Sequence, residues 1–261
     1  MNLPMILELE KARRFRSKFH SGKPCWGAQL ALSDPAVAEI FGRAGFDWLV
    51  VDTEHTATNL PTVRAMLQAA AATQAILLAR PLRFDADEIR RLLDLGSPGV
   101  LCPFINTGEE ARRLVEACRY PPAGTRGFGP RRAGLYGFDS DQYFAEANAA
   151  MLCLGIIESQ QAIENIDDIV KVAGFDGVVI GPLDLSISLG CYKQFAHPSY
   201  VAAVEAVRQA CRRRGKAMGH GCQSIEHARE CRAMGDTLLL AGGDDAFLAS
   251  EARRYMTELT E

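Results

Sequence analysis

The sequence predicts a single (β/α)₈ barrel, an α/β fold, over residues 1–261. Eight short apolar segments alternate along the chain with amphipathic segments whose apolar residues recur every three or four positions. Such alternation requires parallel strands, because parallel neighbours are joined by a crossover that is usually a helix. An open doubly wound sheet is the alternative, but no glycine-rich GxGxxG turn follows the first apolar segment, CWGAQLAL. Closure into a barrel is therefore favoured.

The predicted strands are the apolar segments themselves. They cover residues 25–32, 47–52, 75–80, 99–104, 151–158, 176–181, 216–221 and 237–242. The amphipathic segments predict helices over residues 61–72, 86–96, 109–119, 162–174, 199–215 and 225–235, with a short N-terminal helix before residue 22 and another after Asp34, where Pro35 suits the first turn. A glycine that tolerates the left-handed conformation follows several of these helices, at Gly96, Gly174, Gly215 and Gly235.

The composition is that of an ordinary globular protein and excludes several classes of function. Hydrophobic residues make up 48% of the chain, and no apolar run reaches the ~20 residues that a membrane helix needs. The net charge is −3 and the basic residues are dispersed, so nucleic acid is a poor candidate partner. The N-terminal segment lacks the small-residue cleavage site of a secretory signal, which favours a cytoplasmic location.

The eight cysteines are spread along the chain without a CxxC pair. Several lie within apolar runs, such as VLCPF and LCLGII. This pattern predicts buried, reduced thiols rather than a disulfide framework or a zinc site.

One segment interrupts the alternation of strands and helices. Residues 120–144, YPPAGTRGFGPRRAGLYGFDSDQYF, are far longer than the usual connection of ~2–6 residues. We interpret this segment as a candidate lid or specificity loop. Arg131 and Arg132 within it either recognise a distal carboxylate of the substrate or are simply solvated.

Polar side chains occur where the predicted strands end, which is where barrel enzymes carry their chemistry. Glu158 and Asp184 follow neighbouring strands, so the two carboxylates are expected to converge at one rim. An oxygen-preferring cation between them would remove their repulsion, which predicts Mg²⁺ or Mn²⁺ with Co²⁺ tolerated. The alternative is that each carboxylate caps the helix that follows it.

Two further strand ends carry ionisable side chains. Arg80 ends the third strand, where its guanidinium would polarise a carbonyl or serve as a structural anchor at the rim. His55 lies three residues after Asp52, close enough for the carboxylate to orient the ring; an ordinary core or surface histidine is the alternative.

The turn Gly181-Pro182-Leu183-Asp184 follows the sixth strand. Glycine permits close backbone approach, and the amides of Leu183 and Asp184 at a helix start would favour a carboxylate.

The motifs VVDTEH, LLARP, YPPAGTRGFGP, IIES and VVIGPLDLS, in this order, resemble the HpcH/HpaI aldolase family over about residues 22 to 255. The resemblance implies a metal-dependent aldolase that uses pyruvate and an aldehyde, without an organic cofactor. It implies Glu158 and Asp184 as metal ligands, Arg80 on the pyruvate oxygen, and His55 with Asp52 as the acid/base dyad. It also implies a homo-oligomer, a hexamer or trimer, in which the last helix is exchanged between subunits.

The chain departs from the family pattern on the acceptor side. Gln29 stands in the first strand where some members have tryptophan, and Ile156 stands two residues before the ligand Glu158 where some have glutamine. The seventh strand ends in GHGCQ, so His220 either contacts the acceptor or fills a layer of the barrel. The acceptor aldehyde stays open at this point.

Three rival functions remain. A metal-dependent decarboxylase or lyase, acting on oxaloacetate or a citramalyl-type substrate, would use the same enolate. A Schiff-base aldolase is disfavoured, because Lys171 lies in a predicted helix and Lys216 at the start of a strand. From another class, the chain would be an idle barrel that serves as a binding or assembly module.

Overall fold

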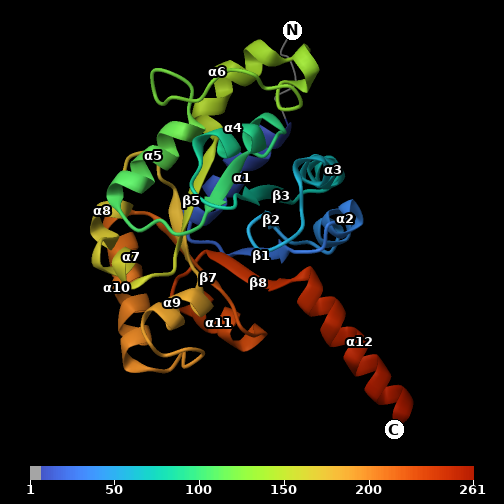
Figure 1. The fold of residues 1–261 in the computed structure, drawn as a ribbon, viewed down its shortest axis with the longest axis vertical. Helices are drawn as coiled ribbons and strands as arrows, with labels where there is room; N and C mark the ends of the chain where they lie inside the picture. The colour runs from blue at the N-terminus through green and yellow to red at the C-terminus, as the bar shows by residue number, and fades with distance from the viewer. Residues whose placement is uncertain (1–6) are drawn as a thin grey trace.

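The computed structural model describes residues 7–261 and shows a closed barrel of eight parallel strands in chain order (Figure 1). The strands are β1 (Cys25–Leu30), β2 (Trp48–Asp52), β3 (Ile76–Arg80), β4 (Gly99–Cys102), β5 (Leu152–Ile157), β6 (Gly177–Ile180), β7 (Ala217–Gly221) and β8 (Leu238–Gly243). Pairing of β8 with β1 closes the barrel. The predicted fold and all eight predicted strands are confirmed.

The helices lie outside the barrel and follow the predicted pattern. They are α1 (Leu7–His20), α2 (Pro35–Arg43), α3 (Leu60–Ala71), α4 (Ala86–Asp94), α5 (Gly108–Cys118), α6 (Ser140–Ala150), α7 (Gln160–Glu164), α8 (Ile166–Val170), α9 (Pro182–Ser188), α10 (Pro198–Arg214), α11 (Ile225–Ala233) and α12 (Asp244–Thr260). The predicted helix over residues 162–174 is two short helices, because Asn165 leaves the helical conformation between them and its side chain donates to the carbonyl of Asn106. The four predicted terminal glycines all have positive φ.

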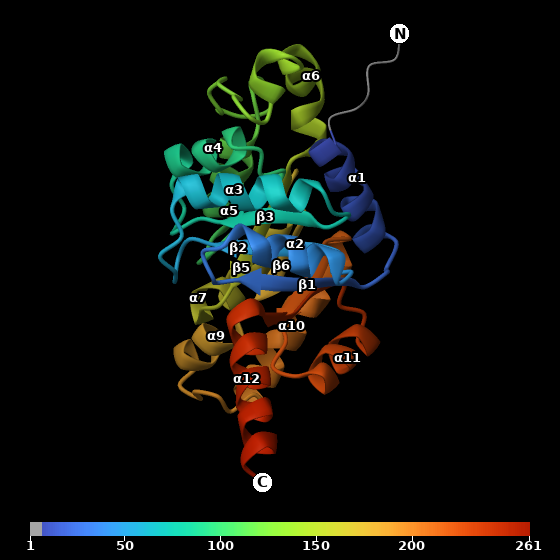
Figure 2. The same ribbon diagram turned by 90° about the vertical axis from the view of Figure 1, so that its right-hand side faces the viewer.

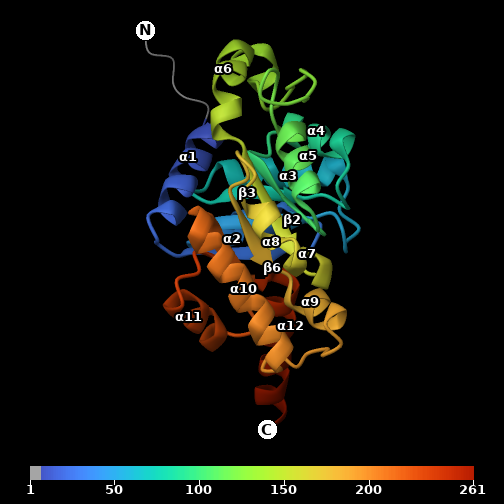
Figure 3. The ribbon, with the colours of Figure 1, turned by 90° about the vertical axis from the view of Figure 1, so that its left-hand side faces the viewer.

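Helix α1 closes the end of the barrel at which the strands begin. Its Ala12, Phe15 and Phe19 belong to the same buried cluster as the side chains that fill the barrel interior, and Phe15 lies 5.7 Å from the ring of Trp48. Figures 2 and 3 show α1 running along this side of the barrel. This end is therefore filled with apolar side chains.

The segment 120–144 does not form a lid over the strand C-termini, contrary to our interpretation. It leads into β5, so it lies at the face where strands begin, and its last residues form α6, at the opposite end of the molecule from α9 and α12 (Figure 1). The side chain of Arg126 is buried and donates to Asp94 Oδ1 over 2.7 Å. Arg132 donates to backbone carbonyls in and after two neighbouring helices, whereas Arg131 is exposed. The segment anchors helices at the closed end.

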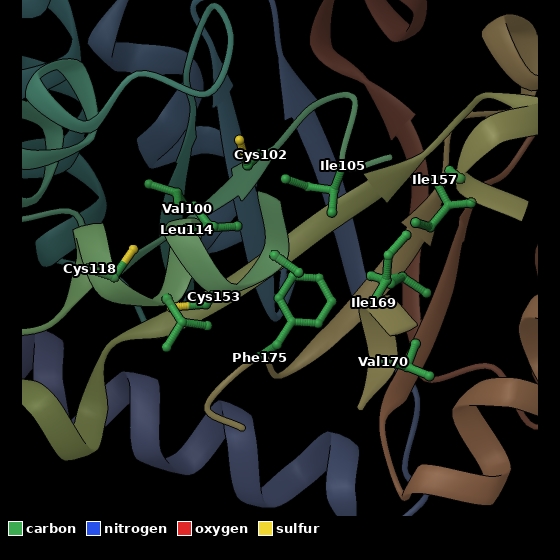
Figure 4. Close-up of a cluster of buried hydrophobic side chains, with 14 of the residues drawn as sticks. Val100, Cys102, Ile105, Leu114, Cys118, Cys153, Ile157, Ile169, Val170 and Phe175 are labelled. Carbon is green, nitrogen blue, oxygen red and sulfur yellow. The ribbon is translucent and has the colours of Figure 1, made fainter. Parts of the chain in front are cut away.

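Alternate side chains of each strand point into the barrel and outward to the helices. On β7, for example, Ala217 belongs to the interior cluster and Met218 to an outer cluster. Figure 4 shows part of this outer cluster, in which Leu114 of α5 and Ile169 of α8 pack with Val100, Phe175 and other side chains. The alternation decides which residue of each strand reaches the open end of the barrel.

Close packing inside the barrel depends on one glycine of β7. A Cβ atom at Gly219 would lie 1.7 Å from the carbonyl oxygen of Leu238, so an alanine would force the strands apart. We expect Gly219→Ala to destabilise the fold by about 3 kcal/mol or more, or to prevent folding. Chemical denaturation measures this, with Gly127→Ala as the control because a Cβ there meets only Arg90 atoms at 3.5 Å and beyond. Equal stability of the two variants would contradict the packing.

All eight cysteines are unpaired, and all except Cys222 are buried, as the sequence predicts. Within residues 7–261, no helix combines the length and the apolar character needed to cross a membrane.

Candidate active site

Predicted site residues follow the apolar interior residues of their strands at the next position that faces into the barrel. On β2, Trp48 and Val50 lie in the interior cluster, and Asp52 is the next residue on that side. On β5, Ile156 lies in the interior cluster and Glu158 follows it. The same period of two therefore carries polar side chains to the top of the barrel, above its apolar layers.

Asp52 forms the base of the site. It is 0% exposed, and it pairs in register with Arg80 on the adjacent strand. Its Oδ1 accepts from Arg80 Nε over 2.9 Å and its Oδ2 accepts from Arg80 Nη2, which fixes the guanidinium in a two-point contact. Oδ2 also accepts from the side-chain amide of Gln29 over 2.9 Å. Burial favours the neutral acid, but the hydrogen bonds and charge of Arg80 outweigh it and lower the pKa of Asp52.

The ring of His55 lies beside Glu54. His55 Nε2 is 3.5 Å from Glu54 Oε2, and the histidine side chain is 61% exposed. The contact of Asp52 with His55 is through the backbone amide of His55, at 3.3 Å, and not through the ring. Glu54 Oε2 also lies 3.4 Å from Arg80 Nη1. The carboxylate beside the imidazole is therefore that of Glu54.

Glu158 is a buried carboxylate with one backbone donor. Its Oε1 accepts from the amide of Phe104 over 2.8 Å, and Phe104 adopts a left-handed φ of 49° at the end of β4 to present that amide. Burial, with the nearby charges of Asp184 and Glu54, raises the pKa of Glu158 to about 7. A Cβ atom at Gly181 would lie 2.5 Å from Glu158 Oε2, so only glycine fits there.

Neither Glu158 nor Asp184 is a helix cap. Ser159 caps α7, and Gly181 holds the N-cap position of α9. Asp184 lies in the first turn of α9, and its charge contributes to the raised pKa of both Glu54 and Glu158, in each case after the larger effect of burial. The capping alternative is therefore wrong for both carboxylates.

A cavity of about 660 Å³ opens at the C-terminal ends of the strands. It is lined by the following predicted site residues: Gln29, His55, Arg80, Glu158, Gly181, Pro182, Leu183 and Asp184. Asp52 lies beneath them. A second cavity, of about 450 Å³, lies at the closed end around Arg132 and contains none of these residues.

His220, predicted as a substrate contact or barrel-filling residue, has neither position. It follows Met218 and Gly219 on β7, so its side chain lies on the outer side of the strand, and it is 2% exposed. Its Nε2 is 3.1 Å from the hydroxyl of Tyr200 on α10. The cavity is lined by the next residues, Gly221 and Cys222.

Sequence reasoning missed two residues of the site. Glu54 was assigned no role, although it stands between Arg80 and His55. Phe104 was not considered, because only the left-handed backbone reveals that its amide serves Glu158. The acidic pair Asp52 and Glu54 in VVDTEH was the one signal in the sequence that pointed to the first of them.

The donor set at this end fits a hard divalent cation. Glu158 is buried with a raised pKa, which shows that the described residues do not fully balance its charge. The negative charges of Asp184 and Glu54 also raise the pKa of Glu158. The nearby cation, Arg80, already forms an ion pair with Asp52. Carboxylate oxygens are the ligands that Mg²⁺ and Mn²⁺ prefer, so Glu158 and Asp184 are suitable ligands for such an ion.

Comparisons with a family model, with curated proteins and with solved structures all point to the same family. Residues 27–251 match the model of the family described as HpcH/HpaI aldolase/citrate lyase. The chain is 38% identical to a 4-hydroxy-2-oxo-heptane-1,7-dioate aldolase of Klebsiella pneumoniae, over 94% of this chain and 93% of that protein. It is 39% identical to a hydroxypyruvate/pyruvate aldolase of Deinococcus radiodurans, over 96% and 91%. The crystal structure of an HpcH/HpaI aldolase/citrate lyase family protein from Burkholderia cenocepacia superposes with a TM-score of 0.91 at 28% identity, covering 95% of this chain and 99% of that one.

Proposed function

The chain belongs to the HpcH/HpaI aldolase/citrate lyase family, and we propose that it is a carbon–carbon lyase that joins pyruvate to an aldehyde or cleaves the resulting 4-hydroxy-2-oxo acid. Two relatives at 38% and 39% identity carry aldolase names, which supports this reaction class. The observation that carries the proposal is that Arg80, Glu158 and Asp184 line one cavity at the open end of the barrel.

Glu158 and Asp184 would hold a divalent ion, Mg²⁺ or Mn²⁺ with Co²⁺ tolerated, and no organic cofactor is needed. When bound, this ion supplies the Lewis acid that stabilises the enolate of pyruvate. Glu158 must lose its proton to serve as a ligand, and its raised pKa of about 7 places that step near neutral pH.

Arg80 would stabilise negative charge on the pyruvate keto oxygen. Asp52 engages its Nε and Nη2, so the guanidinium is held in one orientation before substrate arrives. A preorganised donor aimed at the position where charge develops is the most effective form of electrostatic catalysis. Asp52 lies beneath the cavity that Arg80 lines, and Nη1, the nitrogen that Asp52 does not engage, lies 3.4 Å from Glu54 Oε2.

His55 would move the proton at C3 of pyruvate. Its ring lines the cavity and lies 3.5 Å from the carboxylate of Glu54. Asp52, the dyad partner implied by the family, would act indirectly, through the backbone amide of His55 and through Arg80. Histidine next to a carboxylate is a suitable general base near neutral pH.

The other residues at the rim would bind the two ends of the substrate. The Gly181-Pro182-Leu183-Asp184 turn lines the cavity, and the backbone amides of Leu183 and Asp184 would receive the pyruvate carboxylate. Gln29 lines the cavity on β1 while its side-chain amide donates to Asp52, and we propose that Gln29 contacts the acceptor.

An assay of aldol turnover tests the proposal. The purified chain is incubated with pyruvate and a small aldehyde after EDTA treatment, and then with Mg²⁺ or Mn²⁺ restored. We expect no turnover after EDTA and recovery with the metal. An absence of turnover with every metal and aldehyde tried, in a folded chain, would favour an idle barrel.

Replacement of His55 should slow exchange of the pyruvate C3 protons. We expect His55→Ala to reduce the rate of exchange into deuterated water by about 10²-fold, because general base catalysis contributes about this much. Nuclear magnetic resonance of pyruvate measures the exchange without an aldehyde. His20→Ala is the control, since His20 lies at the far end of α1. Exchange at the parental rate in His55→Ala would place the base elsewhere.

A second candidate reaction uses the same enolate. The family description includes citrate lyase, and loss of carbon dioxide from oxaloacetate or cleavage of a citramalyl-type substrate would need the same donor half of the site. Product analysis with oxaloacetate, compared with a 4-hydroxy-2-oxo acid, separates the two reactions.

We also propose that the chain works as a homo-oligomer, a hexamer or trimer, in which α12 packs on a neighbouring subunit. This helix projects away from the barrel (Figures 1 and 2). Several of its large apolar side chains are exposed by 58% or more: Leu248, Tyr255, Met256 and Leu259. An exposed apolar face of this kind is typical of a protein–protein contact.

A further inference from the structure

A second cluster of ligand-type side chains lies outside the cavity, between the end of β7 and helix α11. His220, His227 and Cys231 each offer a nitrogen or sulfur atom, and these three atoms lie within 4.8 Å of one another. His220 and Cys231 are buried, and the two histidine rings meet edge to face with centroids 4.9 Å apart. None of these three residues has a part in the proposed aldolase reaction.

One nitrogen of this cluster lacks a partner. His220 Nδ1 is buried and makes no hydrogen bond within the part of the chain that the structure describes. The other nitrogen, Nε2, is 3.1 Å from the hydroxyl of Tyr200. If Nε2 carries the proton and donates it to Tyr200, Nδ1 presents its lone pair to the cluster. This is the arrangement found around metal-bound histidines, whose second nitrogen is held by an outer partner.

Helix α11 carries two of the three candidate ligands. His227 and Cys231 are four residues apart on α11, so they lie on one face of it. Cys222 follows β7 and donates through its Sγ to the carbonyl of His220, at 3.5 Å, which makes it a nearby candidate for a fourth ligand.

We propose that His220, His227 and Cys231 form a zinc site, with Cys222 or water as the fourth ligand. Imidazole and thiolate are the ligands that Zn²⁺ prefers, whereas Mg²⁺ and Mn²⁺ prefer the carboxylates of the cavity. Zinc bonds of about 2.0–2.3 Å put tetrahedral ligand atoms roughly 3.5 Å apart. The cluster, whose ligand atoms lie within 4.8 Å of one another, would therefore close by at most about 1.3 Å when the ion enters.

Zinc binding would change a hydrogen bond of a residue that lines the cavity. The amide of Gln223 donates to His227 Nδ1 over 3.3 Å, a long hydrogen bond that a coordinated, Nδ1-protonated ring would give up. Gln223, Cys222 and Ser224 line the cavity, and Ser224 caps α11 by accepting from the amide of His227. Zinc would instead link β7, through His220, to α11, through His227 and Cys231, while the turn residue Gln223 loses its bond to His227.

Titration with Co²⁺ tests this site by its spectrum. Cobalt bound to a thiolate gives a near-ultraviolet charge-transfer band that oxygen ligands cannot give, so the result is independent of the aldolase proposal. Because the carboxylate site is also expected to accept Co²⁺, we expect the band to reach its full height by two equivalents of Co²⁺, and Zn²⁺ to abolish it. Cys231→Ser should lose the band if water is the fourth ligand and at least half of its intensity if Cys222 is, and His227→Ala should bind at least tenfold more weakly. Cys211→Ser, which removes a buried thiol on α10, is the matched control and should keep it.

The thermal midpoint provides a second measurement. Zn²⁺ should raise the midpoint of the parent and of Cys211→Ser, because a ligand that binds only the folded state stabilises it, and should not raise that of Cys231→Ser. Circular dichroism verifies that each variant folds. The absence of a charge-transfer band at saturating Co²⁺ in the folded parent, or an unchanged band in Cys231→Ser, would overturn the proposal.

Discussion

Arg80→Ala should lower kcat/KM for aldol turnover by at least about 10²-fold while divalent metal binding is retained. Removal of one preorganised donor from an oxyanion site costs about 10²–10³ in rate, and Arg80 is fixed for such a role by its two-point contact with Asp52. Steady-state kinetics measure turnover, and calorimetry with Mn²⁺ measures metal binding. Activity within tenfold of the parent would refute the role assigned to Arg80.

The control for this variant must address stability. Loss of Arg80 leaves Asp52 buried without its cation, and breaking a buried ion pair costs about 3–5 kcal/mol. The double variant Asp52→Asn/Arg80→Met removes the stranded charge, so it should recover stability but not turnover. Arg80→Lys keeps the charge and loses the two-point contact; we expect it to be folded and still severely impaired.

Glu158→Gln should abolish binding of the divalent ion and, with it, turnover. The substitution keeps the shape of the side chain and removes the charge that burial and nearby carboxylates already disfavour in the metal-free chain. Isothermal titration with Mn²⁺ measures the effect. The exposed Glu164 on α7 supplies the control, since Glu164→Gln removes the same charge outside the cavity. A parental metal titration in Glu158→Gln would rule out its assignment as a ligand.

The pH dependence of metal binding follows from the same carboxyl. Glu158 has a pKa raised to about 7, so below that pH it carries a proton that the metal must displace. Metal affinity should therefore fall by up to about tenfold per pH unit as the pH drops below 7, and should level off above it. Titrations of the parent at several pH values measure this slope, and Glu164→Gln, which keeps the proposed ligand, should show the same slope.

Much of the fold could be predicted because the alternation of apolar and amphipathic segments is regular. Strand positions agree to within a few residues, and three of the four terminal glycines, Gly96, Gly215 and Gly235, lie within two residues of a helix end. The convergence of Arg80, Glu158 and Asp184 was also predictable, since the C-terminal ends of parallel strands share one face of a barrel.

The remaining features depend on side-chain direction, which strand ends alone do not specify. His220 was expected either to contact the acceptor or to fill a layer of the barrel, but the alternation of inward and outward side chains places it on the outer side of β7. His55 lies after β2, in a turn that directs its ring to Glu54 and only its backbone to Asp52. The segment 120–144 was interpreted as a lid because its length was considered without its position, which is before a strand and therefore at the closed end.

The bonds that Gln29 and Arg80 both make to Asp52 have an evolutionary consequence. Because the Asp52 carboxylate orients both Gln29, the proposed acceptor contact, and Arg80, the proposed enolate-stabilising residue, a substitution at Gln29 would affect Arg80 through Asp52. Mutational effects at Gln29 and Arg80 should therefore be epistatic, with a coupling energy of about 0.5–3 kcal/mol in transition-state stabilisation, as for other residues of one hydrogen-bond network. Lineages that gain activity on a new aldehyde substrate by substitution at Gln29 would then depend on compensating substitutions elsewhere. The order in which these substitutions arise would limit the number of accessible evolutionary pathways.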